Sequence, residues 1–466
     1  MGYISTIFIA TIVTVSIVGV YVNGEEGEYE DAGVEAPMVK TEQEALYSAI
    51  QGFVGKWWNG SDLYPDPCGW TPIQGVSCDI YDGFWYVTGL NIGSIQDNSL
   101  ACASNPEIRS SLFLLTHLKS LAFFDCFHTP PIVISSENWT LLSGSLESLE
   151  FRSNLGLTGA IPAAFSHLHK LQSLVVIGNG FSGGLPANIG NLTHLRRLVL
   201  SENGFSGEIG DDYGNLSELL ILDLSRNSLS GSIPLTFGGL TSLLKLDLSQ
   251  NQLVGKIPNE ISNLKNLTLL DLSNNNISGG LTKSVQELSS LKELVLSRNS
   301  IGGDLMGIEW QNLKGLMVLD LSSTQLMGGI PKSISEMKKL RFLGLNDNYL
   351  SGNLTPKLAE LCDLSSLYVY GNNLSGKLEF DGGFYGKMSR RFGAWNNSNL
   401  CVPVDLLPTD LRPFGIKTCR EELEVSSFHE SDSKLHNFVT SFGFTTYKLD
   451  GMWGLFSVVV SFNMVM

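Results

Sequence analysis

The stretch LLILDLSRNSLSGSIPLTFGGL, from Leu219 to Leu240, is one copy of a unit that recurs through more than half of the sequence. When the copies are aligned on Asn227, an asparagine returns every 24 residues, and the spacing lengthens once, to 25 residues, at Thr324. The aligned asparagines are Asn179, Asn203, Asn227, Asn251, Asn275, Asn299, Asn348 and Asn372. Such a regular period predicts a solenoid, in which each unit buries its apolar edge against its neighbours.

The repeated pattern is L-x-x-L-x-L-x-x-N-x-L, which is the signature of leucine-rich repeats. Two leucines flank one residue in each copy, as Leu222 and Leu224 do, and this spacing predicts a short strand with an apolar inner side. Neighbouring copies should place these strands side by side, so we expect an α/β repeat solenoid with one parallel concave sheet. The asparagine amide is expected to donate to buried carbonyl groups where the chain leaves the strand. Thr324 cannot supply both donors, which predicts a local irregularity.

Charge restricts the class of partner. The 466 residues carry a net charge of −16, and charged residues make up only 16% of the chain. A protein that binds nucleic acid needs a basic face, whereas the basic clusters here are isolated. The composition therefore argues against nucleic acid as a partner.

Six of the seven cysteines lie in segments that flank the regular repeats, which predicts disulfides closing the two ends and an oxidising compartment. These six are Cys68, Cys78, Cys102, Cys126, Cys401 and Cys419. The seventh, Cys362, falls between strands, and we expect it to be a buried spare thiol.

The segments outside the repeats predict a secreted protein. Ile7 to Val22 is apolar and typical of a signal peptide, and a helix is expected from Thr41, capped by Thr41 and Glu44. The apolar tail favours a removable GPI signal, and a merely sticky C-terminus is the alternative. The expected organisation is 1–24 signal peptide, 25–40 acidic leader, 41–85 N-terminal cap, 86–398 leucine-rich repeats (about 13 units), 399–419 C-terminal cap, 420–451 polar spacer and 452–466 hydrophobic tail.

The motif L-S-G-x-I-P, seen as SGSIP from Ser230 to Pro234, resembles the plant-specific class of leucine-rich repeats. This resemblance implies a superhelix with Cys-containing caps and a second short strand after the asparagine. The Cys102–Cys126 region and RRFGAWNNSNLC, residues 390–401, are similar to the Piriformospora indica-insensitive protein group. Members of that group are receptor-like proteins without a kinase, and the resemblance implies a role in sensing or accommodating microbes.

Nine Asn-x-Ser/Thr sequons predict N-glycosylation on exposed faces if the chain is secreted. They begin at Asn59, Asn138, Asn191, Asn215, Asn266, Asn276, Asn353, Asn373 and Asn396.

Two short motifs could suggest an enzyme, but both coincide with repeat positions. Gly180 to Gly184 matches G-x-S-x-G, yet Ser182 occupies the ordinary L-S-G slot of the repeat. No metal-binding motif is present, and the seven scattered histidines form no ligand pair. We therefore expect no catalysis, no cofactor and no metal.

The concave face is where binding residues are expected. Its central positions, Asp223, Asp247 and Asp271, follow the repeat consensus and are interpreted as structural and solvated. Departures from the consensus are better candidates, because exposed aromatic and arginine side chains often anchor interfaces. The predicted ligand-binding residues are Arg152, Arg197, Phe342, Tyr368 and Tyr370.

Together these observations predict a non-enzymatic, glycosylated receptor-like protein or co-receptor on the extracellular side of a plant plasma membrane. Lacking a kinase, it would act by binding an extracellular protein, peptide or glycan and a transmembrane receptor kinase. The alternative is a secreted inhibitor of cell-wall-degrading enzymes, which the same scaffold could also support.

Overall fold

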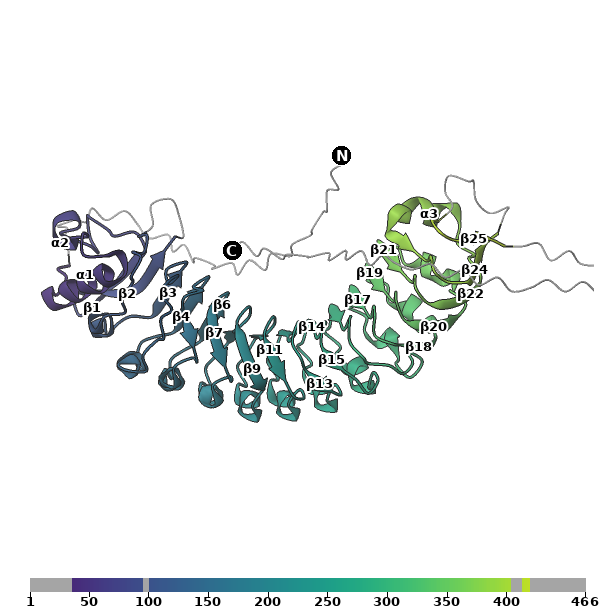
Figure 1. Cartoon of the computed structure of the whole chain (residues 1–466), viewed down its shortest axis with the longest axis horizontal. Helices are drawn as coiled ribbons and strands as arrows, with labels where there is room; N and C mark the ends of the chain where they lie inside the picture. Colours follow the sequence, from purple (N-terminus) through teal and green to yellow (C-terminus); the bar gives the residue numbers. More distant parts are fainter. Residues whose placement is uncertain (1–35, 95–99, 404–412, 420–466) are drawn as a thin grey trace, which may run out of the picture. The chain divides into compact units, whose positions relative to one another are not determined.

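The chain forms a curved solenoid with the main sheet on its concave side (Figure 1), and the strand leucines are buried in the core beneath that sheet. The computed structural model describes residues 36–94, 100–403 and 413–419. Its main sheet has 14 strands, all parallel except the first pair, β1 and β2. The strands are β1 Val76–Tyr81, β2 Phe84–Gly93, β3 Ser120–Phe124, β4 Ser148–Arg152, β6 Ser173–Ile177, β8 Arg197–Val199, β10 Ile221–Asp223, β12 Lys245–Asp247, β14 Leu269–Asp271, β16 Glu293–Val295, β17 Val318–Asp320, β19 Phe342–Gly344, β21 Ser366–Tyr368 and β23 Phe392–Gly393.

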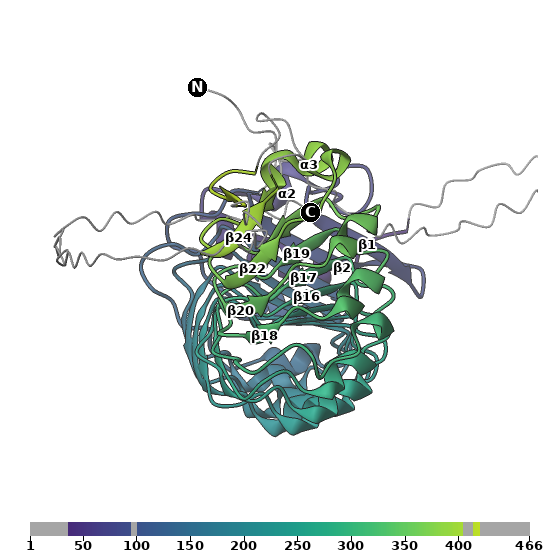
Figure 2. The same ribbon diagram turned by 90° about the vertical axis from the view of Figure 1, so that its right-hand side faces the viewer.

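Short outer strands and single helical turns complete each coil, and Figure 2 shows them on opposite sides of the solenoid. The outer strands are β5 Thr158–Gly159, β7 Gly180–Gly183, β9 Gly204–Glu208, β11 Ser228–Ser230, β13 Val254–Gly255, β15 Asn276–Ile277, β18 Met327–Gly329, β20 Tyr349–Gly352, β22 Asn373–Lys377, β24 Asn399–Val402 and β25 Lys417–Thr418. The 3-10 turns are η1 Ser110–Leu114, η2 Trp139–Leu142, η3 Ala163–His167, η4 Ala187–Asn191, η5 Asp211–Asn215, η6 Leu235–Gly239, η7 Asn259–Asn263, η8 Lys283–Glu287, η9 Trp310–Asn312, η10 Lys332–Glu336, η11 Pro356–Glu360 and η12 Ser389–Arg391. The second strand that the L-S-G-x-I-P motif implied is therefore present.

The predicted hydrogen bonds of the repeated asparagines are confirmed, and we call this row of asparagines the asparagine ladder. Asn227 donates through Nδ2 to the carbonyl oxygens of Leu200, Leu224 and Ser225 at 2.9, 3.1 and 3.1 Å. Its Oδ1 accepts from the backbone N–H of Phe205 in the preceding repeat, at 3.1 Å. The ladder satisfies buried backbone groups in two adjacent repeats at once.

The ladder also extends one repeat beyond each end of the aligned series. Asn154 donates to the carbonyl oxygens of Phe123 and Arg152, and Asn397 donates to those of Val369 and Ala394. The ladder therefore continues into the less regular repeats next to both caps.

The irregularity at Thr324 is confirmed as well. Its hydroxyl donates to the Leu321 carbonyl at 2.6 Å, and the following residue, Gln325, adopts left-handed backbone with a φ of 61°, unlike the residues after the aligned asparagines. The main sheet keeps its register there, with Leu294 opposite Leu319, so the extra residue disturbs only the outer side. Between β15 and β18 the outer strands are reduced to isolated bridges.

Helices lie near both ends of the solenoid (Figure 1), and disulfides join segments there. At the N-terminal end, α1 (Lys40–Val54) and α2 (Gly60–Leu63) precede β1, and α3 (Gly382–Met388) lies near the other end. The cysteines form three disulfides: Cys68–Cys78, Cys102–Cys126 and Cys401–Cys419.

Two expectations about the flanks and the spare cysteine were wrong. Helix α1 starts at Lys40 with Val39 at the N-cap, so Thr41 lies inside the helix and forms no cap with Glu44. Cys362 is exposed rather than buried, because it lies in the connection after η11 instead of on an inward position. The predicted signal peptide, acidic leader, polar spacer and apolar tail lie outside the described residues, apart from residues 36–40.

Candidate ligand-binding surface

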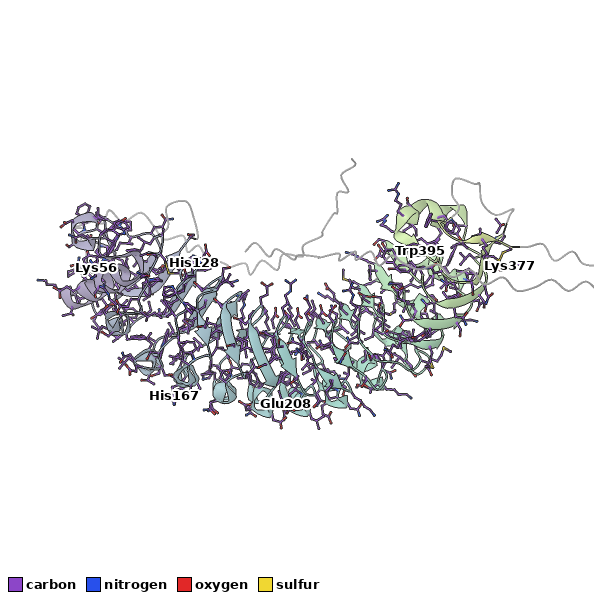
Figure 3. The ribbon with its side chains drawn as sticks, in the orientation of Figure 1. Lys56, His128, His167, Glu208, Lys377 and Trp395 are labelled. Atoms are coloured by element: carbon purple, nitrogen blue, oxygen red, sulfur yellow. A yellow bond between two sulfur atoms is a disulfide. The ribbon has the colours of Figure 1, made fainter. Side chains whose placement is uncertain are left out.

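Five aromatic side chains form a continuous strip, which we call the aromatic strip, from β19 to the C-terminal cap. Consecutive ring centroids lie 5.9 Å apart for Phe342 and Tyr368, 6.3 Å for Tyr368 and Tyr370, and 4.3 Å for Tyr370 and Trp395. The rings of Tyr370 and Trp395 are stacked, with an interplanar angle of 6°. Phe414 meets the edge of Trp395 at 6.3 Å. Figure 3 places Trp395 on the inner side of the C-terminal arm.

Sheet register explains how the strip is built. Asp320, Gly344, Tyr368 and Gly393 occupy equivalent positions on four neighbouring strands. A Cβ on Gly344 would lie 2.7 Å from an Asp320 carboxylate oxygen, and one on Gly393 would lie 2.7 Å from the Trp395 ring. The two glycines therefore leave room for neighbouring side chains, which lie over the backbone at these positions.

The C-terminal cap holds the far end of the strip. Gly415 has a φ of +73°, and a Cβ there would lie 2.8 Å from the Trp395 Cβ, so only glycine fits this close approach. The Cys401–Cys419 disulfide fixes the same cap segment, with the two Cα atoms 4.9 Å apart. Phe414 is left 83% exposed. Phe414 therefore forms the exposed rim of the strip, next to four half-buried rings.

The tyrosine in the middle of the strip is held in its neutral form. Burial raises the pKa of Tyr370, and the nearby Asp347 carboxylate adds to the increase. Its hydroxyl group therefore remains a hydrogen-bond donor at physiological pH.

The two predicted arginines lie far from these aromatics along the sheet. Arg152 ends β4 and pairs with Glu150 on the same strand, at 2.8 Å. Arg197 begins β8, and its Nε is buried without a hydrogen-bond partner. The structure thus brings Phe342, Tyr368 and Tyr370 together, leaves Arg152 and Arg197 near the other end, and adds Trp395 and Phe414, which the sequence analysis did not select.

The central concave row is less solvated than the repeat consensus suggested. Asp223 and Asp247 are only 14% and 16% exposed at their side chains, and Lys245 lies between them at 3.4 and 3.5 Å. Each of the three carboxylates accepts a backbone N–H two residues later, as Asp271 does from Ser273 at 2.9 Å. The solvated interpretation was wrong because these side chains fold back on the strand ends.

Because the Asp271 carboxylate is largely buried, the stability of the protein should depend on pH in a way that can be tested. Burial, followed by the charge of Asp247, raises the pKa of Asp271 to about 6. The folded protein therefore binds more protons than the unfolded chain between pH 4 and 6, so this residue makes stability fall as pH rises through that window. We expect Asp271→Asn to raise the unfolding free energy at pH 7.5 by about 1–2 kcal/mol, and by much less at pH 4.

Denaturant unfolding at the two pH values measures this difference. Asp304→Asn is the matched control, because the Asp304 carboxylate also accepts a backbone N–H, from Met306 at 2.8 Å, but is exposed. A variant of Asp271 that loses stability at pH 7.5 would contradict the assignment.

All nine sequon asparagines are exposed, and none lies on a strand of the main sheet. On the side of the 3-10 turns, Asn138 precedes η2, Asn191 and Asn215 end η4 and η5, and Asn266 follows η7. Asn276 and Asn373 begin outer strands, Asn353 follows β20, and Asn396 follows Trp395. Glycans at the other positions would leave the concave strands uncovered, whereas one at Asn396 would lie next to Trp395 of the aromatic strip.

Comparisons with known proteins give the same architecture. Residues 185–300 match a model described as a leucine-rich repeat region, and residues 315–337 match one described as a leucine rich repeat. Over 161 residues the chain is 61% identical to Piriformospora indica-insensitive protein 2 of Arabidopsis thaliana, covering 34% of this chain and 38% of that protein. It is 34% identical to Receptor like protein 29 of the same plant, over 31% of each chain. The matched regions therefore span 38% and 31% of the lengths of these two relatives.

Solved structures with this fold include plant receptors. The peptide hormone receptor RGFR1 in complex with RGF2 is 31% identical, with a TM-score of 0.57, covering 64% of this chain and 46% of the receptor chain. PEPR1–AtPEP1 is 25% identical, with a TM-score of 0.58, covering 78% and 52%. These matches and the solenoid described above show a plant-type leucine-rich repeat fold, in a chain similar to Piriformospora indica-insensitive protein 2 and to Receptor like protein 29.

Proposed function

We propose that this protein is a non-enzymatic, cell-surface receptor-like protein that binds an extracellular peptide on the aromatic strip. The observation that carries the proposal is the strip itself. It replaces the consensus face over three repeats, and its rings in these repeats are half-buried. Aromatic side chains supply large contact areas at little entropic cost, which suits recognition of an extended peptide.

The comparisons support a peptide ligand in general terms. RGFR1 and PEPR1 are solved with RGF2 and AtPEP1, and both are at least 25% identical to this chain. A link to microbes rests on the name of one relative, Piriformospora indica-insensitive protein 2. The proposed role is therefore perception of a peptide signal during contact with microbes.

Signalling would require a second protein. In the described part of the chain, no helix is long and apolar enough to cross a membrane. We propose that the occupied solenoid recruits a membrane-spanning receptor kinase, and that the apolar tail at residues 452–466 attaches the protein to the outer face of the plasma membrane. The three disulfides and nine exposed sequons are consistent with that location.

Affinity capture from plant membranes tests this function. The full chain, expressed in plant cells with its own leader, should recover a membrane-spanning kinase and a bound peptide. The triple variant Phe342→Ala, Tyr368→Ala and Tyr370→Ala should recover neither. Tyr349→Ala serves as the control, because Tyr349 is a 67% exposed aromatic on the outer strand β20. An unchanged set of partners in the triple variant would refute the assignment of the site.

A further inference from the structure

Four aspartates occupy equivalent places on the concave face, and their carboxylates differ in the partners they have. They are the last residues of β10, β12, β14 and β17: Asp223, Asp247, Asp271 and Asp320. The Oδ2 atoms of Asp223 and Asp247 lie 3.4 and 3.5 Å from Lys245 Nζ. Asp320 Oδ1 accepts from the N–H and the hydroxyl of Ser322 at 3.1 and 2.7 Å, whereas no described residue donates to Asp320 Oδ2. Asp320 therefore has one acceptor oxygen left for a ligand.

Sheet register explains why Asp320 has no lysine beside it. Lys245 lies between its two aspartates because it is on the same strand as one of them and on the strand next to the other. Around Asp320 the corresponding places hold Val318, on its own strand, and Phe342, on the next one. An aliphatic side chain and an aromatic ring therefore replace the cation.

The Asp320 carboxylate lies beside rings of the aromatic strip. Gly344 is its neighbour on the next strand, and a Cβ there would lie 2.7 Å from Asp320 Oδ1 and 3.0 Å from Phe342 Cε1. Tyr368 takes the same place one strand further. A guanidinium suits this arrangement, because its planar fork of N–H groups donates to a carboxylate while its face stacks on an aromatic ring. A purely apolar side chain would contact the rings but leave the covered carboxylate without a partner.

A second carboxylate, that of Asp347, lies just beyond the end of β19 and is exposed. Its Oδ2 accepts from Asn346 Nδ2 at 2.8 Å, and a Cβ on Gly371 would lie 2.5 Å from its Oδ1. Tyr370, whose pKa is raised in part by this charge, immediately precedes Gly371. In the described part of the chain, neither Asp320 nor Asp347 forms an ion pair.

The other charged groups around the strip lie elsewhere. Arg341 and Arg391 are exposed just before β19 and β23, at the strand starts, whereas the two carboxylates lie at strand ends. Arg298 directs its Nη1 to the Asn274 side chain of the preceding repeat, at 3.5 Å. Glu293 is an exposed carboxylate at the start of β16, outside the strip. The strip is therefore negative at its strand-end edge, so a cationic side chain of a ligand belongs there.

We propose that the aromatic strip selects peptides that carry an arginine, and that Asp320 determines this selectivity. The guanidinium donates to Asp320 Oδ2 and stacks against the rings of Phe342 and Tyr368. Asp347 attracts the cationic peptide to the strip without enclosing a side chain. This selectivity rests on the proposed binding of a peptide by the strip, and it adds the chemical class of that peptide.

Selection of random dodecapeptides on the purified, glycosylated full chain tests the proposal. Peptides that also bind the triple variant Phe342→Ala, Tyr368→Ala and Tyr370→Ala are discarded, so that only ligands of the strip remain. These ligands should contain arginine. Replacing that arginine with citrulline, which has the same shape without the charge, should weaken binding to the wild type by about tenfold. Lysine should weaken it by about threefold, because an ammonium group lacks the planar fork.

Two variants separate the roles of the carboxylates. Asp320→Asn keeps an acceptor oxygen for Ser322, and it should weaken the arginine peptide about tenfold while changing the citrulline peptide by less than about twofold. Asp347→Asn should cost about twofold, an effect that added salt removes. The matched control is Asp304→Asn with Asp363→Asn, which removes exposed carboxylates outside the concave face and should leave affinity within about twofold.

Equal binding of the arginine and citrulline peptides to the wild type would overturn the selectivity and leave peptide binding by the strip intact. Equal binding of the lysine peptide would exclude the stacked guanidinium. Both comparisons use the wild type alone, so they do not depend on the folding of a variant, which the melting temperature establishes. If no peptide depended on the strip, the proposed function itself would fail, and the selectivity with it.

Discussion

Replacing Asn251 with leucine is expected to lower the unfolding free energy by about 4 kcal/mol, because four backbone groups lose their partner in a buried place. The Asn251 amide donates to the carbonyl oxygens of Leu224, Leu248 and Ser249 at 3.0, 3.1 and 3.2 Å, and its Oδ1 accepts from the Leu229 N–H at 3.0 Å. Leucine has nearly the same shape, so the loss would come from unsatisfied polar groups and not from a cavity.

The same substitution should also split the unfolding transition. Leu224 and Leu229 belong to the preceding repeat, so the asparagine amide joins two neighbours as well as closing its own turn. Stability in a solenoid is a sum of repeat terms and interface terms between neighbours. A weakened central interface should let the two halves unfold at different denaturant concentrations.

Guanidinium titrations followed by circular dichroism and by tryptophan fluorescence measure both effects. Asn312→Leu is the matched control, because the exposed Asn312 amide donates only to the Glu309 carboxylate, at 3.4 Å. The control should change stability by less than about 0.5 kcal/mol. A single transition and an equally small loss for Asn251→Leu would show that the ladder does not couple neighbouring repeats.

The repeat scaffold could be predicted because its physical causes are local. Each strand, turn and asparagine is specified within 24 residues, and the same solution then recurs. The Thr324 irregularity was predictable for the same reason, since a hydroxyl group can donate only one hydrogen bond. Its confinement to the outer side was not, because the main-sheet register through Leu319 depends on the neighbouring strands.

The end segments depend on contacts distant in sequence, and predictions there were weaker. Glu42 was an unremarkable polar residue beside the expected Thr41 cap, yet it is buried and accepts the Val87 N–H at 3.2 Å. Burial raises the pKa of this carboxyl group. Strand β1 was also missed, because it pairs antiparallel with β2 and follows no repeat pattern.

Only three of the five aromatic residues of the strip were predicted from the sequence. Phe342, Tyr368 and Tyr370 depart from a consensus that specifies what each slot normally holds. Trp395 occupies the slot equivalent to Tyr370, one strand further, but it lies where the repeat spacing has changed. Extending the asparagine ladder to Asn397 would have placed Trp395 beside Tyr370. Phe414 comes from the cap, and only folding shows that it meets Trp395.

Truncating Trp395 to alanine is expected to weaken binding of the peptide that co-purifies with the protein by about 30-fold or more, which corresponds to about 2 kcal/mol. Trp395 lies inside the strip with a ring on each side, because it stacks on Tyr370 at 4.3 Å and also meets Phe414. Its loss removes contact area and leaves the Tyr370 ring without its stacked neighbour. Hot spots usually lie at such central, partly buried aromatic residues.

Calorimetric titration of the peptide into each purified variant measures the effect. Phe414→Ala should cost less than Trp395→Ala, about fivefold, because a rim residue remains largely solvated in the complex. Tyr349→Ala, on the outer strand β20, should leave affinity unchanged.

Because Trp395 also packs against the cap at Gly415, the Trp395→Phe variant separates binding from folding. It keeps an aromatic ring against Tyr370 and should recover most of the affinity. If Trp395→Ala bound as tightly as the wild type while Tyr349→Ala bound weakly, the ligand would lie on the outer face instead.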